Sequence, residues 1–283
     1  MNTRIIFMCL FLSLIPNNVV QAGICEGKTG IPGTFERTIV SDDWGRTYLL
    51  HVPTLYEGNA PVPLILNFHG LGHSGEYQAD YTDMSSKADV ENFIVIYPDG
   101  LAMSWNADGC CPPAMLYDID DVGFALDLVD AISEEYCIDP DRIYATGSSN
   151  GGMLSHRLAC EASNVFAAIG VASASITTSA CNPPRPVPVI QTQGTVDPIV
   201  PYWTAKASND YWASHNRCGD SEVVYQKGGA LCTAYQDCAE DATVEFCEVS
   251  GMGHTWPNDE GAFDWIDATD LFWEFFTQHA MTY

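Results

Sequence analysis

The chain has 283 residues, a length that suits one large α/β domain or two small ones. Its formal net charge of −26 disfavours nucleic acid, anionic membranes and polyanionic substrates as partners, because like charges repel one another. This charge excludes partners but says nothing about the chemistry that the protein performs.

The first 22 residues have the features of a secretory signal peptide. Arg4 supplies the positive charge of the N-terminal region, residues 5–15 form an apolar core, and residues 20–22 form a small-residue cleavage site. The apolar core is too short to span a bilayer, and no second long apolar segment follows it. We therefore expect residues 23–283 to be exported, to the extracellular space or the periplasm.

Apolar runs alternate with helical patterns along most of the chain. Runs that are apolar throughout, such as residues 63–68 and 93–97, are typical of strands buried on both faces of a parallel sheet. The expected strands are residues 35–40, 46–52, 63–68, 93–97, 142–146, 165–172, 187–193, 222–225, 230–235 and 243–249. The expected helices are residues 76–90, 120–136, 152–160, 203–216 and 267–279. No repeat or linker divides this succession, so we predict a single α/β catalytic domain with a mostly parallel central sheet and helices on both faces.

Residues 147–151, Gly-Ser-Ser-Asn-Gly, fit the pattern G-x-S-x-G between an expected strand and an expected helix. In this context the pattern predicts a nucleophile elbow, a sharp turn that exposes a serine hydroxyl. Gly147 and Gly151 flank Ser149 at positions where a Cβ would collide with a neighbouring strand or helix. An ordinary small-residue turn is the alternative, but the flanking elements favour an α/β-hydrolase fold with Ser149 as nucleophile.

A serine nucleophile needs an orienting acid and a base, which follow it in that order in α/β-hydrolases. Asp197 comes directly after a late strand and is our candidate for the acid. Asp220 and Asp237 are rivals, although both lie beside cysteines in polar turns. Of seven histidines, only His254 combines the right order with a loop after the last strand. The others precede the serine or lie in expected helices: His51, His69, His73, His156, His215 and His279.

An oxyanion hole needs two backbone N–H groups. One belongs to Asn150, the residue after the nucleophile, and the other to Leu71 in the turn after the strand of residues 63–68. Trp105 and Trp256 are candidates for the walls of an acyl pocket, although burial in the core explains Trp105 equally well.

The cysteines favour disulfide bonds rather than a metal site. Cys9 lies in the expected leader, which leaves ten of the 11 cysteines. An even number in an exported chain favours bridges, and the C-x-x-C spacing of a zinc site is absent. The acidic residues 118–121 are a possible metal site, but we interpret them as the solvated start of a helix, where the dipole favours anions. We expect neither a metal nor a cofactor.

Short motifs that run through almost the whole mature chain carry a resemblance to a known family. They are His69-Gly70, Trp105-Asn106 with Cys110-Cys111, residues 120–124, the elbow, residues 157–160, residues 194–202 and His254-Thr255-Trp256-Pro257. The chain resembles the secreted esterases grouped as polyhydroxybutyrate depolymerase-like and feruloyl esterases, which are similar to carbohydrate esterase family 1. The resemblance implies a triad of Ser149, Asp197 and His254. Gln193 is a departure, because relatives often have histidine there.

Three disulfide bonds are expected. Cys232 and Cys247 lie at roughly opposite positions of two strands that we expect to pair as a hairpin, so a bridge is geometrically possible. The resemblance implies two more, one between Cys218 and Cys238 and one from Cys160 to either Cys110 or Cys111.

The triad and the resemblance together predict a secreted serine carboxylesterase. Its expected substrates are hydroxycinnamoyl esters, such as feruloyl groups on fragments of plant cell-wall polysaccharides. Depolymerisation of poly(3-hydroxybutyrate) and deacetylation of xylan are alternatives on the same triad, although no separate substrate-binding domain follows to support the first. An inactive hydrolase that serves as a binding module is a remote alternative, which hydrolysis of a p-nitrophenyl ester would exclude.

Overall fold

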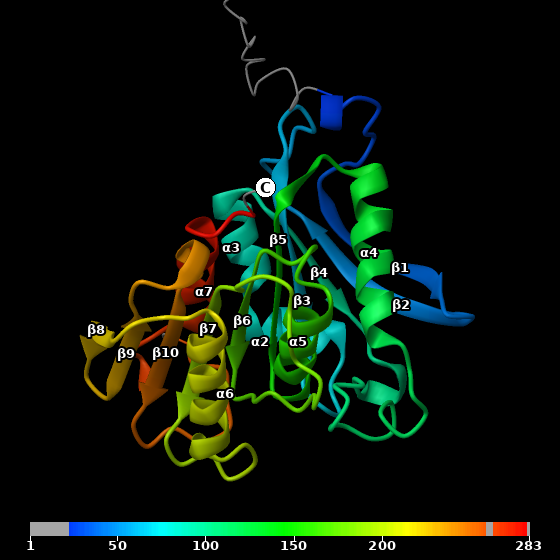
Figure 1. Ribbon diagram of the computed structural model, residues 1–283. Helices are drawn as coiled ribbons and strands as arrows, with labels where there is room; N and C mark the ends of the chain where they lie inside the picture. Colours follow the sequence, from blue (N-terminus) through cyan, green and yellow to red (C-terminus); the bar gives the residue numbers. More distant parts are fainter. Residues whose placement is uncertain (1–22, 259–262, 282–283) are drawn as a thin grey trace, which may run out of the picture.

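The computed structural model describes residues 23–258 and 263–281 (Figure 1). The expected signal peptide lies outside these residues. In the part of the chain described, one ten-stranded sheet has the order β1-β2-β4-β3-β5-β6-β7-β10-β9-β8. The strands are β1 (Gly33–Ser41), β2 (Trp44–Val52), β3 (Val62–Phe68), β4 (Ile94–Pro98), β5 (Ile138–Ser148), β6 (Ala168–Ala172), β7 (Val189–Gly194), β8 (Ser221–Lys227), β9 (Ala230–Tyr235) and β10 (Val244–Val249).

The centre of the sheet is parallel and both of its ends are antiparallel. Neighbouring strands from β4 through β3, β5, β6 and β7 to β10 run in the same direction. The pairs β1–β2, β2–β4, β10–β9 and β9–β8 are antiparallel. Loops that follow the parallel strands therefore meet at one edge of the sheet, where ligands bind in open α/β sheets.

Helices cover both faces of the sheet, as the apolar runs predict. In β3, Leu64 and Leu66 pack into one core while Ile65 packs into the other. Figure 1 shows α4, α5 and α6 over the face that carries Leu64 and Leu66, and α3 and α7 over the face that carries Ile65. The helices are α2 (Gly75–Thr82), α3 (Met84–Glu91), α4 (Asp121–Glu135), α5 (Asn150–Glu161), α6 (Tyr202–His215) and α7 (Ala268–Thr277), with short 3-10 turns η1 (Leu101–Met103) and η2 (Ala239–Asp241).

The helix expected over residues 76–90 is two helices, α2 and α3. Asp83 separates them in the left-handed conformation, with φ of 46°. At this break Asn67 of β3 donates from Nδ2 to Thr82 Oγ1 at 3.0 Å, and the next residue, Met84, enters the second core. Tertiary contacts on both sides of Asp83 thus favour the break over a continuous helix.

Two of the three expected disulfide bonds are present. Cys232 and Cys247 are directly opposed on β9 and β10 and are bridged. Cys218 and Cys238 are also bridged. The bridges of the described residues are Cys25–Cys137, Cys110–Cys111, Cys160–Cys181, Cys218–Cys238 and Cys232–Cys247.

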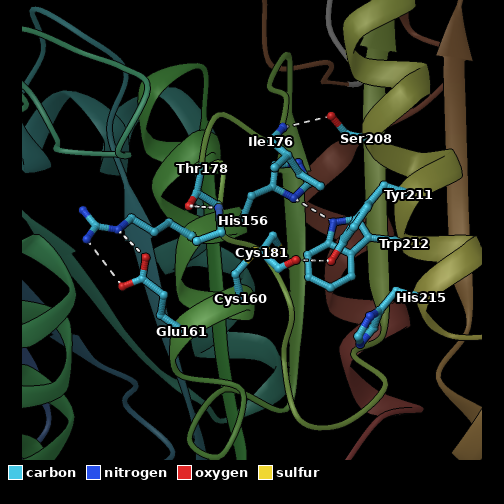
Figure 2. The surroundings of a disulfide bond; sticks show 12 residues. His156, Cys160, Glu161, Ile176, Thr178, Cys181, Ser208, Tyr211, Trp212 and His215 are labelled. Atoms are coloured by element: carbon cyan, nitrogen blue, oxygen red, sulfur yellow. Dashed lines mark hydrogen bonds and ion pairs between the residues drawn. A yellow bond between two sulfur atoms is a disulfide. The ribbon is translucent and has the colours of Figure 1, made fainter.

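The expected bridge between Cys160 and Cys110 or Cys111 is wrong. Cys110 and Cys111 bond to each other, and Cys160 bonds to Cys181 (Figure 2). Cys160 lies near the end of α5, and a loop that packs against α6 brings Cys181 to it. The Tyr211 hydroxyl of α6 donates to the carbonyl oxygen of Cys181 at 2.7 Å. The partner of Cys160 is therefore decided by the packing of α6 beside α5.

Candidate active site

The turn between β5 and α5 has the strained geometry of a nucleophile elbow. Ser149 adopts φ of 53° and ψ of −121°, which a non-glycine residue rarely adopts. A Cβ at Gly151 would lie 2.1 Å from the carbonyl oxygen of Phe68, and one at Gly147 would lie 2.6 Å from the same atom. Both glycines are therefore required by the close approach of β3, as the sequence predicts.

Asp197 and His254 lie in the loops that follow β7 and β10. These two strands are parallel neighbours, so their carboxyl ends bring the two loops together. His254 Nδ1 donates to Asp197 Oδ2 at 2.8 Å, and the Asp197 side chain is fully buried. This bond fixes a proton on Nδ1 and leaves Nε2 as the ring nitrogen that can accept one.

Three further donors satisfy the buried carboxylate of Asp197. The backbone N–H groups of Ile199 and Val200 donate to Oδ1 at 2.8 and 2.9 Å. Gln193 Nε2 donates to Oδ2 at 3.0 Å. These donors satisfy the acceptor capacity of a carboxylate that has no access to water. Gln193, which departs from the family pattern, is thus a direct hydrogen-bond partner of Asp197.

Ser149 and His254 line the same cavity, which has a volume of about 500 Å³. The loop after β3 and helix α2 form one part of its wall, and the segment around residue 110 together with α5 and the loop after Asp197 forms another. The lining residues are Gly70, Leu71, His73, Tyr77, Tyr81, Cys110, Cys111, Ser148, Ser149, Met153, Ser173, Ile199, Val200, His254 and Thr255. The rival acids Asp220 and Asp237 are not among them.

The turn after β3 lies beside Ser149 and is held by His69. His69 Nδ1 donates to the carbonyl oxygen of Gly70 at 2.7 Å, and His69 Nε2 accepts the backbone N–H of Gly100 at 2.9 Å. Burial lowers the pKa of His69 to about 4, so the ring is neutral and can make both bonds. Leu71 follows on the cavity wall, and Asn150 begins α5, where a backbone N–H has no partner within the helix.

The two tryptophans expected in the pocket wall are buried in the core, so that expectation is wrong. Trp105 has no exposed surface and donates from Nε1 to the carbonyl oxygen of His69 at 2.9 Å. Trp256 is 2% exposed and donates from Nε1 to Thr269 Oγ1 at 3.2 Å. An indole N–H needs a partner when it is buried, and in both cases the core supplies one.

Other aromatic residues line the cavity instead. The rings of His73 and Tyr77 stack, with centroids 3.9 Å apart and planes 13° apart. The Tyr81 hydroxyl accepts the backbone N–H of Trp256 at 2.6 Å. Trp256 lies two residues after His254. Sequence reasoning missed this face, although the spacing of His73, Tyr77 and Tyr81 by four residues is the signal that could have revealed it.

The acidic residues at the start of α4 have structural partners. Asp120 is exposed and accepts the N–H of Gly123 at 2.8 Å, as expected for a helix start. Asp121 is buried instead of solvated, because it pairs with Arg46 at 2.7 Å and accepts the N–H of Asn106 at 2.7 Å. Over the described residues, no group of three or more His, Cys, Asp or Glu side chains is arranged to hold a metal ion.

The sheet, the elbow and the buried acid–histidine pair define the chain as an α/β-hydrolase. The model of a protein family described as "Esterase PHB depolymerase" matches residues 47–213, more than half of the chain. The chain belongs to this esterase family.

Known proteins agree with this assignment. Feruloyl esterase B of Piromyces equi is 28% identical over 250 residues, covering 80% of this chain and 46% of the relative. A probable feruloyl esterase C of Aspergillus terreus is 27% identical over 277 residues, covering 94% of each. The chain thus spans less than half the length of the first relative and nearly all of the second.

Solved structures show the same fold. An acetyl xylan esterase from Aspergillus awamori matches with a TM-score of 0.66 at 15% identity, covering 86% of this chain and 99% of that chain. A ferulic acid esterase from Anaeromyces mucronatus matches with a TM-score of 0.61 at 18% identity, covering 90% of this chain and 92% of that one. At these identities the likeness concerns the α/β-hydrolase fold.

Proposed function

We propose that the protein is a secreted carboxylic ester hydrolase with a catalytic triad of Ser149, His254 and Asp197. The observation that carries the proposal is the 2.8 Å hydrogen bond from His254 Nδ1 to Asp197 Oδ2, because His254 lines the same cavity as Ser149. A serine on a strained turn, an imidazole and a buried orienting acid are the groups that acyl transfer requires.

The reaction runs in two steps. His254 takes the proton of Ser149 as Oγ attacks the ester carbonyl, and it returns that proton to the departing alcohol. Water then attacks the acyl-enzyme with His254 again as base, and the carboxylic acid leaves. Asp197 holds the His254 tautomer and stabilises the imidazolium ion, while the N–H groups of Leu71 and Asn150 stabilise the oxyanion. No step needs a cofactor.

The substrates in this proposal are hydroxycinnamoyl esters carried by fragments of plant cell-wall polysaccharides. Relatives named feruloyl esterases support this choice. The cavity supports it as well, because its wall combines aromatic rings with apolar side chains that suit a flat acyl group. The net charge of −26 favours neutral feruloylated fragments over anionic pectic ones.

Secretion is supported by the cysteines. Five disulfide bonds join the ten cysteines of the described residues. Such bridges persist in oxidising compartments outside the cytosol. Within residues 23–258 and 263–281 we find no helix with the length and apolar character of a membrane span.

Two other ester classes are second candidates on the same triad. The family description names depolymerisation of polyhydroxybutyrate, and one relative is named as a bifunctional acetylxylan esterase/xylanase from Neocallimastix patriciarum, 26% identical over 219 residues.

A panel of esters tests the proposal. Methyl ferulate, acetylated xylan and 3-hydroxybutyrate oligomers are compared by kcat/KM, with p-nitrophenyl acetate as a common reference. We expect methyl ferulate to be the best substrate. If hydroxycinnamate esters are inert while 3-hydroxybutyrate oligomers are cleaved, the depolymerase candidate replaces it. If p-nitrophenyl acetate and the whole panel are inert, the chain is a binding module.

A further inference from the structure

Two adjacent cysteines form part of the wall of the active-site cavity. Cys110 and Cys111 are bonded to each other and line the cavity together with Ser149. Met153, in the first turn of α5, lines it too. Three sulfur-containing side chains from two separate segments therefore meet at one cavity, and the proposed acyl transfer uses none of them.

The segment that carries this bridge is tied to the residue next to the nucleophile. Asn150 Oδ1 accepts the N–H of Trp105 at 2.8 Å, and Asn150 Nδ2 donates to the carbonyl oxygen of Trp105 at 3.0 Å. The N–H of Cys111 donates to that same carbonyl oxygen at 3.0 Å. The position of the bridge relative to Ser149 is thus fixed through the backbone of one residue.

Other contacts hold the same segment at Asn106 and Ala107. Arg157 Nη1 donates to the carbonyl oxygen of Asn106 at 2.8 Å, and Thr177 Oγ1 donates to that of Ala107 at 2.5 Å. The buried carboxylate of Asp121 accepts the N–H of Asn106 at 2.7 Å. A wall held in this way loses little freedom when a ligand binds, which favours affinity.

We propose that Cys110, Cys111 and Met153 form a sulfur wall that selects esters with an aromatic acyl group. Disulfide and thioether sulfurs are polarisable and make favourable contacts with aromatic rings. An acetyl group has no ring for such a contact, so the wall raises kcat/KM for aryl acyl groups relative to short aliphatic ones. This inference rests on the proposed ester hydrolysis at Ser149 and names the residues that set its acyl preference.

Two variants test the sulfur wall. Met153→Leu removes one sulfur at nearly constant volume and keeps every disulfide bond. Cys110→Ala combined with Cys111→Ala removes the bridge. For each we measure kcat/KM for methyl ferulate and for p-nitrophenyl acetate. We expect the ratio of the two to fall about 2-fold to 3-fold in Met153→Leu and roughly 10-fold in the double variant. The inhibition constant of ferulate should rise in parallel.

A matched control removes a bridge that does not line the cavity, by combining Cys218→Ala with Cys238→Ala. It should lower the melting temperature but leave the ratio of the two kcat/KM values unchanged. If the unmodified enzyme cleaves both esters and Met153→Leu leaves the ratio of their kcat/KM values unaltered, the sulfur wall is overturned. This outcome holds even if the variant without the Cys110–Cys111 bridge does not fold. Failure of the unmodified enzyme to cleave either ester overturns the proposed function instead.

Discussion

The proposed nucleophile and the proposed acid–base pair of this site are positioned in different ways. Ser149 is positioned by five consecutive residues, because the strained turn and the two glycines that permit it are contiguous. Asp197 and His254 are 57 positions apart and meet only because β7 and β10 are parallel neighbours. A short motif therefore suffices to propose the nucleophile, whereas the proposed acid and base depend on the order of the strands.

The two regions also differ in what holds them. On the nucleophile side, the side chain of Asn150 and the buried Asp121 fix the neighbouring loop through backbone atoms. On the acid–base side, the carboxylate of Asp197 is itself the centre of the hydrogen bonds, with Gln193 and His254 among its donors. The hydrogen bonds of the first region hold a backbone geometry, and those of the second region hold a side-chain carboxylate.

The largest expected effect breaks the nucleophile side. Ser149→Ala should lower kcat by roughly 10⁵-fold or more, because the residue at the strained position of the turn then has no hydroxyl to attack the ester. Its melting temperature should stay near that of the unmodified enzyme. Hydrolysis of p-nitrophenyl acetate measures the loss, and Ser148→Ala is the matched control, with a far smaller loss. Phenylmethylsulfonyl fluoride should label Ser149. Retention of a tenth of the activity in Ser149→Ala would rule out this nucleophile.

A somewhat smaller effect breaks the acid–base side. Asp197→Asn keeps the shape but removes the charge, so the His254 ring loses its orienting acceptor and the stabilisation of its imidazolium ion. We expect kcat to fall roughly 10⁴-fold. Asp237→Asn, a change at the exposed rival acid, should leave kcat within about 2-fold, a range typical of surface substitutions. A loss of less than about 10-fold in Asp197→Asn would mean that another carboxylate serves as the acid.

The smallest effect concerns a contact between the two regions. His156 of α5 is buried and accepts Trp212 Nε1–H of α6 at its Nδ1, at 3.1 Å (Figure 2). Burial lowers the pKa of His156 from 6.5 to about 3. As the pH falls below 6.5 the unfolded chain takes up this proton first, so the free energy of unfolding decreases by up to about 1.4 kcal/mol per pH unit.

His156→Asn keeps a hydrogen-bond acceptor but does not titrate. Urea unfolding with intact disulfides should therefore show a shallower loss of stability between about pH 6.5 and pH 4 than in the unmodified protein. The difference between the free energies of unfolding of the two proteins at pH 8, where residue 156 is uncharged in both, measures the loss of packing that the substitution causes. Parallel pH profiles would show that His156 does not contribute to acid sensitivity.

Hydrophobic periodicity predicted most of the architecture. Runs such as residues 63–68 are buried on both faces in the structure, because a parallel strand under two helical layers has no solvent-facing side. The same reasoning missed the break at Asp83, which is neither glycine nor proline. The reason is that two tertiary contacts favour two helices over one: the hydrogen bond from Asn67 to Thr82 and the burial of Met84.

The sequence by itself determined most of the elements, the elbow around Ser149 and the candidates Asp197 and His254, because these depend on local sterics and on chain order. Only the tertiary structure decided which side chains face the cavity. Trp105 and Trp256 are buried in the core, whereas Tyr77, Tyr81 and the Cys110–Cys111 bridge line the site. The physical reason is that the orientation of a side chain depends on how helices and loops pack on the sheet, and composition and spacing do not record that packing.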